Sequence, residues 1–350
     1  MSAEPEAAPT GAGRSRRLVS LFVLCVLAVG ILFPLAENGS QGTMSIAVFV
    51  LIFMASASGW NIFSGYSGYL ALGHAVFFGT GAYAVALAAN DWHVAAGWTI
   101  MWLLPLGGIV AGLFAIPIGL VALRTRRHTF VVVTIAVFFI FQTLATNVGF
   151  TGGTGGKQLP YVSWSFSVYN ERFYYVALAL VVATVLLSWA VRRSRFGLQL
   201  MAIRDDEDRA RGMGVRTGRV KLAAFALSAV PVGIAGGLWG YFLGSLYPQT
   251  AFDPLFDLAL ALMGFFGGIG TIAGPLVGAL VLEWLQQYFT QTFSGGLYLI
   301  IYGALFLVVI LLMPRGIVPS ASQWLRSWRT QREQKASTPA AGAGVAGVAG

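Results

Sequence analysis

Charge is what this sequence has least of. Only 10% of its 350 residues are Asp, Glu, Lys or Arg, against about a quarter in an average soluble domain. The mean hydropathy is +0.75. A helix needs about 20 apolar residues to cross the hydrocarbon layer, and runs of this length recur along the chain. Runs of about ten residues that alternate in polarity, which a membrane β-barrel would need, are absent. The composition therefore predicts an all-α integral membrane protein.

Cysteine and histidine are almost absent too. The single Cys25 excludes a disulfide within the chain and a metal site built from cysteines. The three histidines, His74, His93 and His128, show no ligand spacing and no H-E-x-x-H pair. We therefore expect no catalytic residues, no metal ligands and no bound cofactor, and we interpret the chain as a non-enzyme.

The basic residues predict the orientation of the chain. The formal net charge is +9, but no segment between the apolar runs is long enough for a basic soluble domain, so we expect no nucleic-acid partner. If the basic N-terminus lies in the cytoplasm, all of the 22 Lys and Arg residues except Lys157 and Arg172 fall on that side. Such a bias is typical of cytoplasmic loops. Both termini are expected in the cytoplasm.

Ten apolar segments are expected to span the membrane, and the sequence allows eight to eleven. They lie at about 18–36, 44–64, 70–90, 98–123, 129–149, 173–191, 221–245, 255–270, 273–290 and 297–313. The first run follows "RSRR" as a signal peptide would, but "PLA" at 34–36 is a poor cleavage site, so an uncleaved helix is expected.

Two places leave the number of spans open. Residues 255–290 form one kinked span or two, and two are preferred because one would export the basic C-terminal tail. The glycine-rich "GYSGYLALGH" at 65–74 suits either a short cytoplasmic turn or a helix broken within the membrane. Irregular backbone at that depth needs surrounding protein or a water-filled path.

The transmembrane part is expected over 18–314, between two tails. Residues 1–17 are expected to be a disordered cytoplasmic tail, and residues 315–350 a basic and then low-complexity Ala/Gly tail in the cytoplasm. Two loops are long enough to interact with other proteins, 150–172 outside and 192–220 inside.

The inner loop concentrates acidic charge. Four of the 13 acidic residues stand in a row at 205–208. A short helix over 202–213 would pair Asp205 with Arg209 and Glu207 with Arg211, at a spacing worth about 0.2–0.5 kcal/mol per pair. Gly212 and Gly214, which follow Arg211, would end this helix.

Two interpretations of this loop stay open. One is a solvated linker with surface ion pairs. The other is a helix that docks in a groove of a cytoplasmic protein, which the apolar Ile203, Met213 and Val215 at its ends favour. The residues expected to take part in docking are Arg204, Asp205, Asp206, Glu207, Asp208, Arg209, Arg211, Gly212 and Gly214.

A polar path through the membrane is expected to rest on neutral side chains and freed backbone groups. Some candidates lie beside the glycine-rich stretch, and the others lie on the segment 129–149. They are Asn61, Ser64, Ser67, His74, Gln142, Thr146 and Asn147. The alternative is that these residues and the nearby glycines only pack helix against helix. A proton-driven carrier would need a buried relay, for which only His74 and Glu283 are available.

Four stretches resemble permease subunits of branched-chain amino-acid ABC importers, the LivM type. They are "NIFSGYSGYLALGHAVFFGTGAY" (61–83), "TGGTGG" (151–156), "AIRDDEDRARGMGVRTGRVKLAAFALSAVPVGIAGGLWG" (202–240) and "LMGFFGGIGTIAGPLVGAL" (262–280). A final "MPRGIV" at 313–318 fits the family's ending, and the resemblance covers most of 44–318.

The resemblance implies the fold and partners of an ABC-importer permease. Arg204 to Gly214 would be the docking helix, with Asp208 and Gly214 spaced like the acid and glycine of the ABC-permease coupling motif, although "DRA" replaces "EAA". It implies two cytoplasmic ATPase subunits, a second, paralogous permease and an extracytoplasmic solute-binding protein. This places the chain in the lipid of a bacterial cytoplasmic (inner) membrane.

ATP would be bound by the partner subunits only. "GGTGGKQ" at 152–158 lacks the first Gly and the final Ser or Thr of a P-loop, so this chain has no nucleotide site of its own. The expected solutes are branched-chain amino acids, with urea or short amides as the alternative. The outer loop 150–172 and residues 246–254 would receive the binding protein, unless their aromatic residues only anchor the chain at the membrane interface.

Overall fold

The computed structural model describes residues 30, 33, 41–94, 96–162, 164–292, 300, 303–304, 307 and 316–320. The predicted spans at 18–36 and 297–313 and both tails lie outside the described residues, apart from these few positions.

The described chain is almost entirely helical. Its longer elements are α2 (Gln41–Ser67), α3 (His74–Asp91), α5 (Leu104–Ala122), α6 (Arg127–Asn147), α7 (Phe166–Arg193), α8 (Arg195–Asp205), α10 (Thr217–Leu243), α12 (Pro254–Gly267) and α13 (Ala273–Thr292). Its short elements are α4 (Trp98–Met101), η1 (Gly149–Thr151), η2 (Gly153–Gly155), β1 (Lys157–Gln158), α9 (Glu207–Gly212), β2 (Ser245–Leu246) and α11 (Pro248–Ala251).

Six helical stretches of the described part are long and apolar enough to cross a membrane. They are Gly42–Ser67, Trp98–Ala122, Arg127–Asn147, Val168–Arg193, Thr217–Leu243 and Pro248–Gly267. The prediction of a helical, multi-pass membrane protein is confirmed at this level. The expected number of ten spans stays a prediction.

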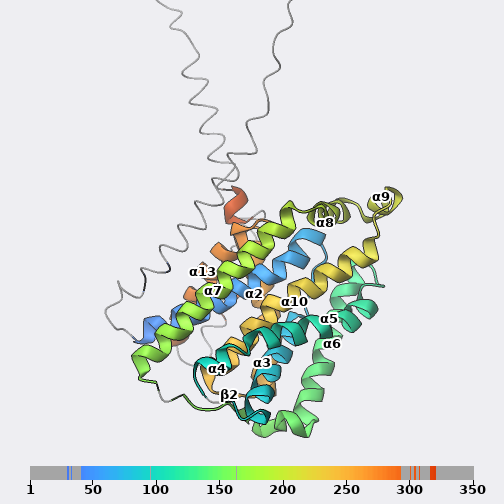
Figure 1. The fold of residues 1–350 in the computed structure, drawn as a ribbon. Coiled ribbons are helices and arrows are strands. Elements are labelled where there is room, and N and C mark those ends of the chain that lie inside the picture. The colour runs from blue at the N-terminus through green and yellow to red at the C-terminus, as the bar shows by residue number, and fades with distance from the viewer. Residues whose placement is uncertain are drawn as a thin grey trace, which may run out of the picture.

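Helices α2 and α10 form the centre of the bundle. Helix α10 packs against α5, α3 and α2, while α2 also packs against α7, α12 and α13 (Figure 1). The core side chains include Trp60, Phe63 and Phe225, all fully buried. Helix α6 lies at the periphery: 22% of its spanning window is buried, against 83% for α2. Its exposed apolar residues, such as Phe139, are suited to lipid or to another apolar helix.

Glycines allow α3, α5 and α10 to approach closely. A Cβ atom added at Gly81 would lie 2.1 Å from the carbonyl oxygen of Gly233, and one added at Gly233 would lie 2.6 Å from that of Gly107. Small residues at such positions are a common means of helix association in membranes. Gly81 and Gly233 therefore serve close helix packing in this structure.

The chain leaves the helical conformation at two places that matter for the site. The first break, residues 68–73, separates α2 from α3, and the second break, residues 268–272, separates α12 from α13. Gly68 has φ +72° and Gly270 has φ +78°, which glycine adopts without strain. Residues 255–290 thus contain two helices, and the prediction that both cross the membrane stays a prediction.

Opposite ends of the bundle carry the two long loops. Helices α8 and α9 lie at one end, and β1, β2 and α4 lie toward the other (Figure 1). Strands β1 and β2 are antiparallel, with Lys157 opposite Leu246 and Gln158 opposite Ser245. This pairing brings the loop 150–172 and the stretch after residue 245 together.

Candidate functional site

The α8–α9 segment is two helices rather than one. Ser194 caps α8, because its Oγ accepts a 3.1 Å hydrogen bond from the Gly197 N–H. Asp206 then stands in extended backbone and caps α9: its Oδ1 accepts from the N–H groups of Asp208 and Arg209, both at 3.0 Å. The backbone hydrogen bond from Arg209 is the main reason why the pKa of Asp206 lies below its usual value.

The expected single helix over 202–213 is therefore wrong. The carboxylate of Asp206 satisfies N–H groups that helical carbonyls would otherwise bond, and an aspartate in this role starts a new helix. The end of α9 agrees with the prediction, because Gly214 has φ +86° and the Val215 N–H donates to the Ala210 carbonyl oxygen at 3.1 Å. This is the Schellman ending that a glycine after a helix favours.

One of the two expected ion pairs is present. Arg211 lies 3.4 Å from Glu207, as predicted. The pair between Asp205 and Arg209 is wrong, because Arg209 instead lies 3.0 Å from the Asp206 carboxylate, where the break in the helix has brought it. Pairs this exposed contribute little, about 0–1 kcal/mol.

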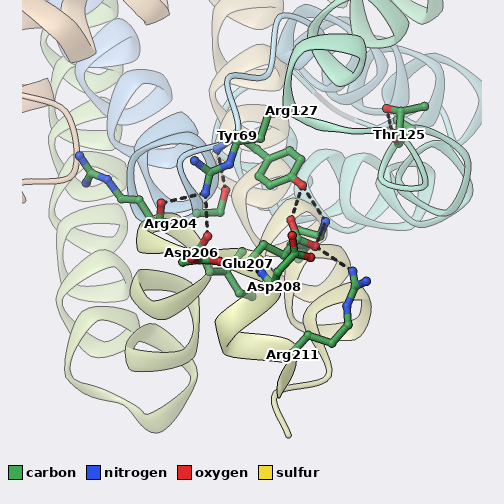
Figure 2. A network of polar contacts seen from close by, with 12 residues as sticks. Tyr69, Thr125, Arg127, Arg204, Asp206, Glu207, Asp208 and Arg211 are labelled. Atoms are coloured by element: carbon green, nitrogen blue, oxygen red, sulfur yellow. Dashed lines mark hydrogen bonds and ion pairs between the residues drawn. The ribbon is translucent and has the colours of Figure 1, made fainter. Parts of the chain in front are cut away.

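Glu207 points into the bundle rather than toward solvent. Its Oε1 accepts a 2.7 Å hydrogen bond from Lys221 Nζ, and its Oε2 accepts from the Tyr69 hydroxyl (Figure 2). Lys221 Nζ also donates to the Tyr69 hydroxyl at 3.0 Å and lies over its ring. Partial burial raises the pKa of Glu207, but the hydrogen bonds from Lys221 and Tyr69 outweigh it and hold the pKa below its usual value.

Two arginines connect the C-terminal end of α8 to the rest of the bundle by hydrogen bonds. Arg127 Nη2 donates to the carbonyl oxygens of Ile203 and Arg204, at 2.7 and 2.8 Å. A cation here complements the partial negative charge of a helix C-terminus. Arg204 in turn reaches into the bundle, and its Nη1 donates to the Gly65 carbonyl oxygen at 2.8 Å (Figure 2).

The second break is bonded to α2 and α7. Asn61 Oδ1 accepts from the Gly270 N–H at 2.8 Å, and its Nδ2 donates to the Thr271 carbonyl oxygen at 2.9 Å. Arg192 Nη1 donates to the Gly270 carbonyl oxygen at 3.1 Å. The first break and the α8–α9 segment thus belong to one hydrogen-bonded network, while the second break is bonded to α2 and α7.

The outer surface of the segment remains available for a partner. Its exposed residues include Asp205, Asp208, Arg209, Arg211, Gly212 and Gly214. Two apolar side chains stand among them, Leu198 at 61% and Met213 at 74% exposure. Of the three apolar residues expected to favour docking, Met213 fits, Ile203 is fully buried in the bundle, and Val215 packs against the core.

The expected pathway residues fall into two groups that the structure does not bring together. Near the first break, Ser64 Oγ accepts from the Ala71 N–H, and Ser67 Oγ donates to the Phe63 carbonyl oxygen. His74 Nε2 lies 3.0 Å from Ser228 Oγ. With Asn61, these residues are buried and hold the irregular backbone in place.

The second group lies on the peripheral α6. Gln142 Nε2 donates to the Phe252 carbonyl oxygen at 2.6 Å, and Thr146 bonds back to its own helix. Asn147 also bonds back to α6 and is exposed. Within the described residues no hydrogen bond joins His74 to Glu283, which instead bonds to Gln287.

The network contains three residues that sequence reasoning missed: Tyr69, Arg127 and Lys221. Lys221 offered a signal, because a lysine at the first position of an apolar span needs a nearby partner or access to water. The only signal for Tyr69 was its position within the glycine-rich stretch. Nothing in the sequence showed that Arg127 would bond the end of α8.

With this geometry described, the chain can be compared with known proteins. Residues 42–310 match the family model described as branched-chain amino acid transport system / permease component. The chain belongs to this family. No solved structure matches it.

Two of three curated relatives cover most of this chain, and the third covers about a third of it. The high-affinity branched-chain amino acid transport system permease protein LivM of Escherichia coli (strain K12) is 28% identical over 335 residues, covering 87% of this chain and 76% of LivM. The corresponding LivH protein of the same organism is 25% identical over 75% of this chain and 89% of LivH. The fructose import permease protein FrcC of Rhizobium meliloti is 28% identical over 128 residues, covering 35% of this chain and 36% of FrcC.

Proposed function

We propose that this chain is a permease subunit of an ATP-driven importer of branched-chain amino acids, and that its α8–α9 segment docks on a cytoplasmic ATPase subunit. The observation that carries the docking role is the division of this segment into two faces. Its inner face is bonded to the bundle through Arg204 and Glu207, while its outer face presents charges around Leu198 and Met213. An apolar side chain framed by polar ones is typical of a protein interface.

In this proposal the bundle spans a bacterial cytoplasmic membrane ten times, with both termini and α8–α9 inside. Two ATPase subunits, a second, paralogous permease and an extracytoplasmic binding protein complete the importer. ATP is bound and hydrolysed by the ATPase subunits. The LivM and LivH relatives, both named as permease proteins of one transport system, support a pair of different permeases.

The pathway is proposed to run past the first break, on the side of the bundle that the second permease covers. Asn61, Ser64, Ser67 and His74 keep the non-helical backbone in position there. Gln142, Thr146 and Asn147 lie apart from this group on α6, and we propose that they line a separate part of the path. A zwitterionic amino acid needs such neutral dipoles because few charges lie within the spans.

The other end of the bundle is the proposed platform for the binding protein. The β1–β2 pair joins the two outer stretches, and Tyr161 is 86% exposed beside it. Arg172 stacks on Trp164, at 4.2 Å from the ring, and also lies over Trp98. Arginine stacked on aromatic rings makes a rigid surface.

The test is purification of the tagged chain from its own membranes in mild detergent, followed by mass spectrometry of its stoichiometric companions. We expect an ATPase and a second permease, and ATP-dependent uptake of leucine after reconstitution with the binding protein. Recovery of the chain alone after crosslinking would contradict the proposal and favour a self-sufficient carrier. Uptake of urea, short amides or fructose but not leucine would retain the permease role and replace the substrate.

A further inference from the structure

The side chain of Arg204 lies between the two helix breaks. Its Nη1 atom bonds the Gly65 carbonyl oxygen at the end of α2. A Cβ atom added at Gly68 would lie 2.9 Å from Cγ of Arg204, and one added at Gly270 would lie 2.1 Å from its Nη1. Glycine at these two positions therefore leaves the space that the arginine fills.

Glu207 bonds directly to the first break. Tyr69, which donates its hydroxyl to Glu207, is itself one of the residues of that break and is 3% exposed. The same hydroxyl accepts from Lys221 on α10. A shift of α9 therefore acts on the break through hydrogen bonds to an ionised group, which are shorter and stronger than neutral ones.

The two breaks are the parts of this region that can change shape most easily. Segments that connect helices absorb changes of φ and ψ, whereas the helices move as rigid bodies. Asn61 bonds the second break to α2, so the two breaks are held to the same helix. Arg204 touches both, and Glu207 reaches the first.

We propose that Arg204 and Glu207 are positioning residues that transmit a displacement of the α8–α9 segment to the breaks at 68–73 and 268–272. The inference rests on the proposed function, because an ATPase docked on α8–α9 supplies the displacement. Their role is distinct from docking, since both side chains point away from the exposed surface of the segment. Loss of either should leave the importer assembled but separate ATP hydrolysis from transport.

The first measurement is the number of leucine molecules imported per ATP hydrolysed by the reconstituted complete importer. Arg204→Met keeps the apolar stem and removes the hydrogen bonds, and Glu207→Gln removes the charge. We expect both to retain the ATPase subunits while the ratio falls about fivefold or more. Arg124→Met, an exposed arginine before α6, is the matched control and should keep the wild-type ratio. Glu207→Lys combined with Lys221→Glu should recover part of the ratio that Glu207→Lys alone loses.

The second measurement reports the break itself. In a Cys25→Ser background, the half-buried Leu70 is replaced by cysteine and its rate of reaction with a maleimide is measured with and without ATP. We expect ATP to change this rate in the wild-type importer, and Arg204→Met to abolish the change. If Arg204→Met does not accumulate in membranes, Arg204→Lys, which keeps the charge but not the fork of donors, replaces it in both measurements.

The outcomes separate this inference from the proposed function. A normal transport ratio in the variants, or an unchanged response at residue 70, would overturn the inference while the importer stands. Loss of the ATPase subunits from the variants would overturn it as well, because the residues would then act in docking. A wild-type chain that neither binds an ATPase nor transports would reject the proposed function first.

Discussion

Lys221, on the second turn of α10, donates a 2.7 Å hydrogen bond to Glu207 of α9, and the Tyr69 hydroxyl is bonded to both. The lysine side chain is only 4% exposed and that of Glu207 is 17% exposed. An ammonium group so far from water is tolerated because a carboxylate and a phenol oxygen surround it. The pair joins the charged α8–α9 segment to a helix that is long and apolar enough to cross a membrane.

Breaking this pair from one side should be costly. In Lys221→Met the Glu207 carboxylate loses its buried partner, and we expect a destabilisation of about 1–3 kcal/mol. The thermal midpoint of the purified protein in detergent measures it. In the double variant Lys221→Met/Glu207→Gln no charge is left unpaired, so the loss should be smaller than the sum of the single losses. An additive result would show that the two groups do not interact.

The same carboxylate predicts a dependence of stability on pH. The pKa of Glu207 in the folded protein lies below its ordinary value of 4.5. Its stabilisation is therefore fully present above about pH 4.5 and is lost as the pH falls through the lower, folded value. The thermal midpoint should decline in this acidic window, and less steeply in Glu207→Gln. The slope that remains in the variant belongs to other groups such as Asp206. Equal slopes would contradict the prediction.

The fold class and most helix positions could be predicted because they depend on local patterns. Apolar runs of spanning length and the bias of basic residues needed no tertiary information. The division at Asp206 could not be predicted from helical spacing. It depends on the Asp206 carboxylate, which accepts hydrogen bonds from backbone N–H groups that could otherwise bond to helical carbonyl oxygens. The i,i+4 rule gave the pair of Glu207 with Arg211 and failed for Asp205, which lies on the other side of that division.

The contacts on the inner face of the α8–α9 segment could not be predicted from the sequence for a different reason. Tyr69 and Lys221 are 152 residues apart, and Arg127 is 76 residues from Ile203. No periodicity connects residues at such separations. The sequence did identify Asn61 and its neighbours as polar groups in an apolar region, but it could not show that their bonds go to the backbone of the breaks.

The contact between α5 and α10 predicts opposite effects for two glycines of one helix. Gly233→Ala places a Cβ atom 2.6 Å from the Gly107 carbonyl oxygen, and overpacking of this kind costs about 1–3 kcal/mol. Gly218→Ala, at the start of α10, has nothing within 4 Å and should gain about 0.5–1 kcal/mol from helix propensity. Thermal midpoints of the two variants should move in opposite directions. A shift of the same sign in both would show that backbone propensity, not packing, governs α10.

The proposed orientation of the bundle predicts which residues a membrane-impermeant reagent can reach. In a Cys25→Ser background, a cysteine at Met213 should react from the cytoplasmic side only, and a cysteine at Tyr161 from the outside only. Both positions are strongly exposed, so failure to react would not be due to burial. Intact cells and inverted membrane vesicles provide the two measurements. Reaction of both positions from one side would contradict the assignment of α8–α9 and β1–β2 to opposite faces.

The exposed apolar residues of the α8–α9 segment test its proposed contact with an ATPase subunit. Leu198→Asp and Met213→Asp place a charge where an apolar side chain would fill a pocket of the partner. Each should weaken association about fivefold or more, as expected for a residue worth more than 1 kcal/mol in an interface. Retention of the ATPase during purification at increasing dilution measures the change.

Asp205→Ser and Asp208→Ser should mainly change how the association depends on salt concentration, because charges at the rim of an interface affect the association rate more than the affinity. If both aspartate substitutions at the apolar positions leave association unchanged, the partner binds elsewhere, and the two faces of the segment would have to be explained by the bundle alone.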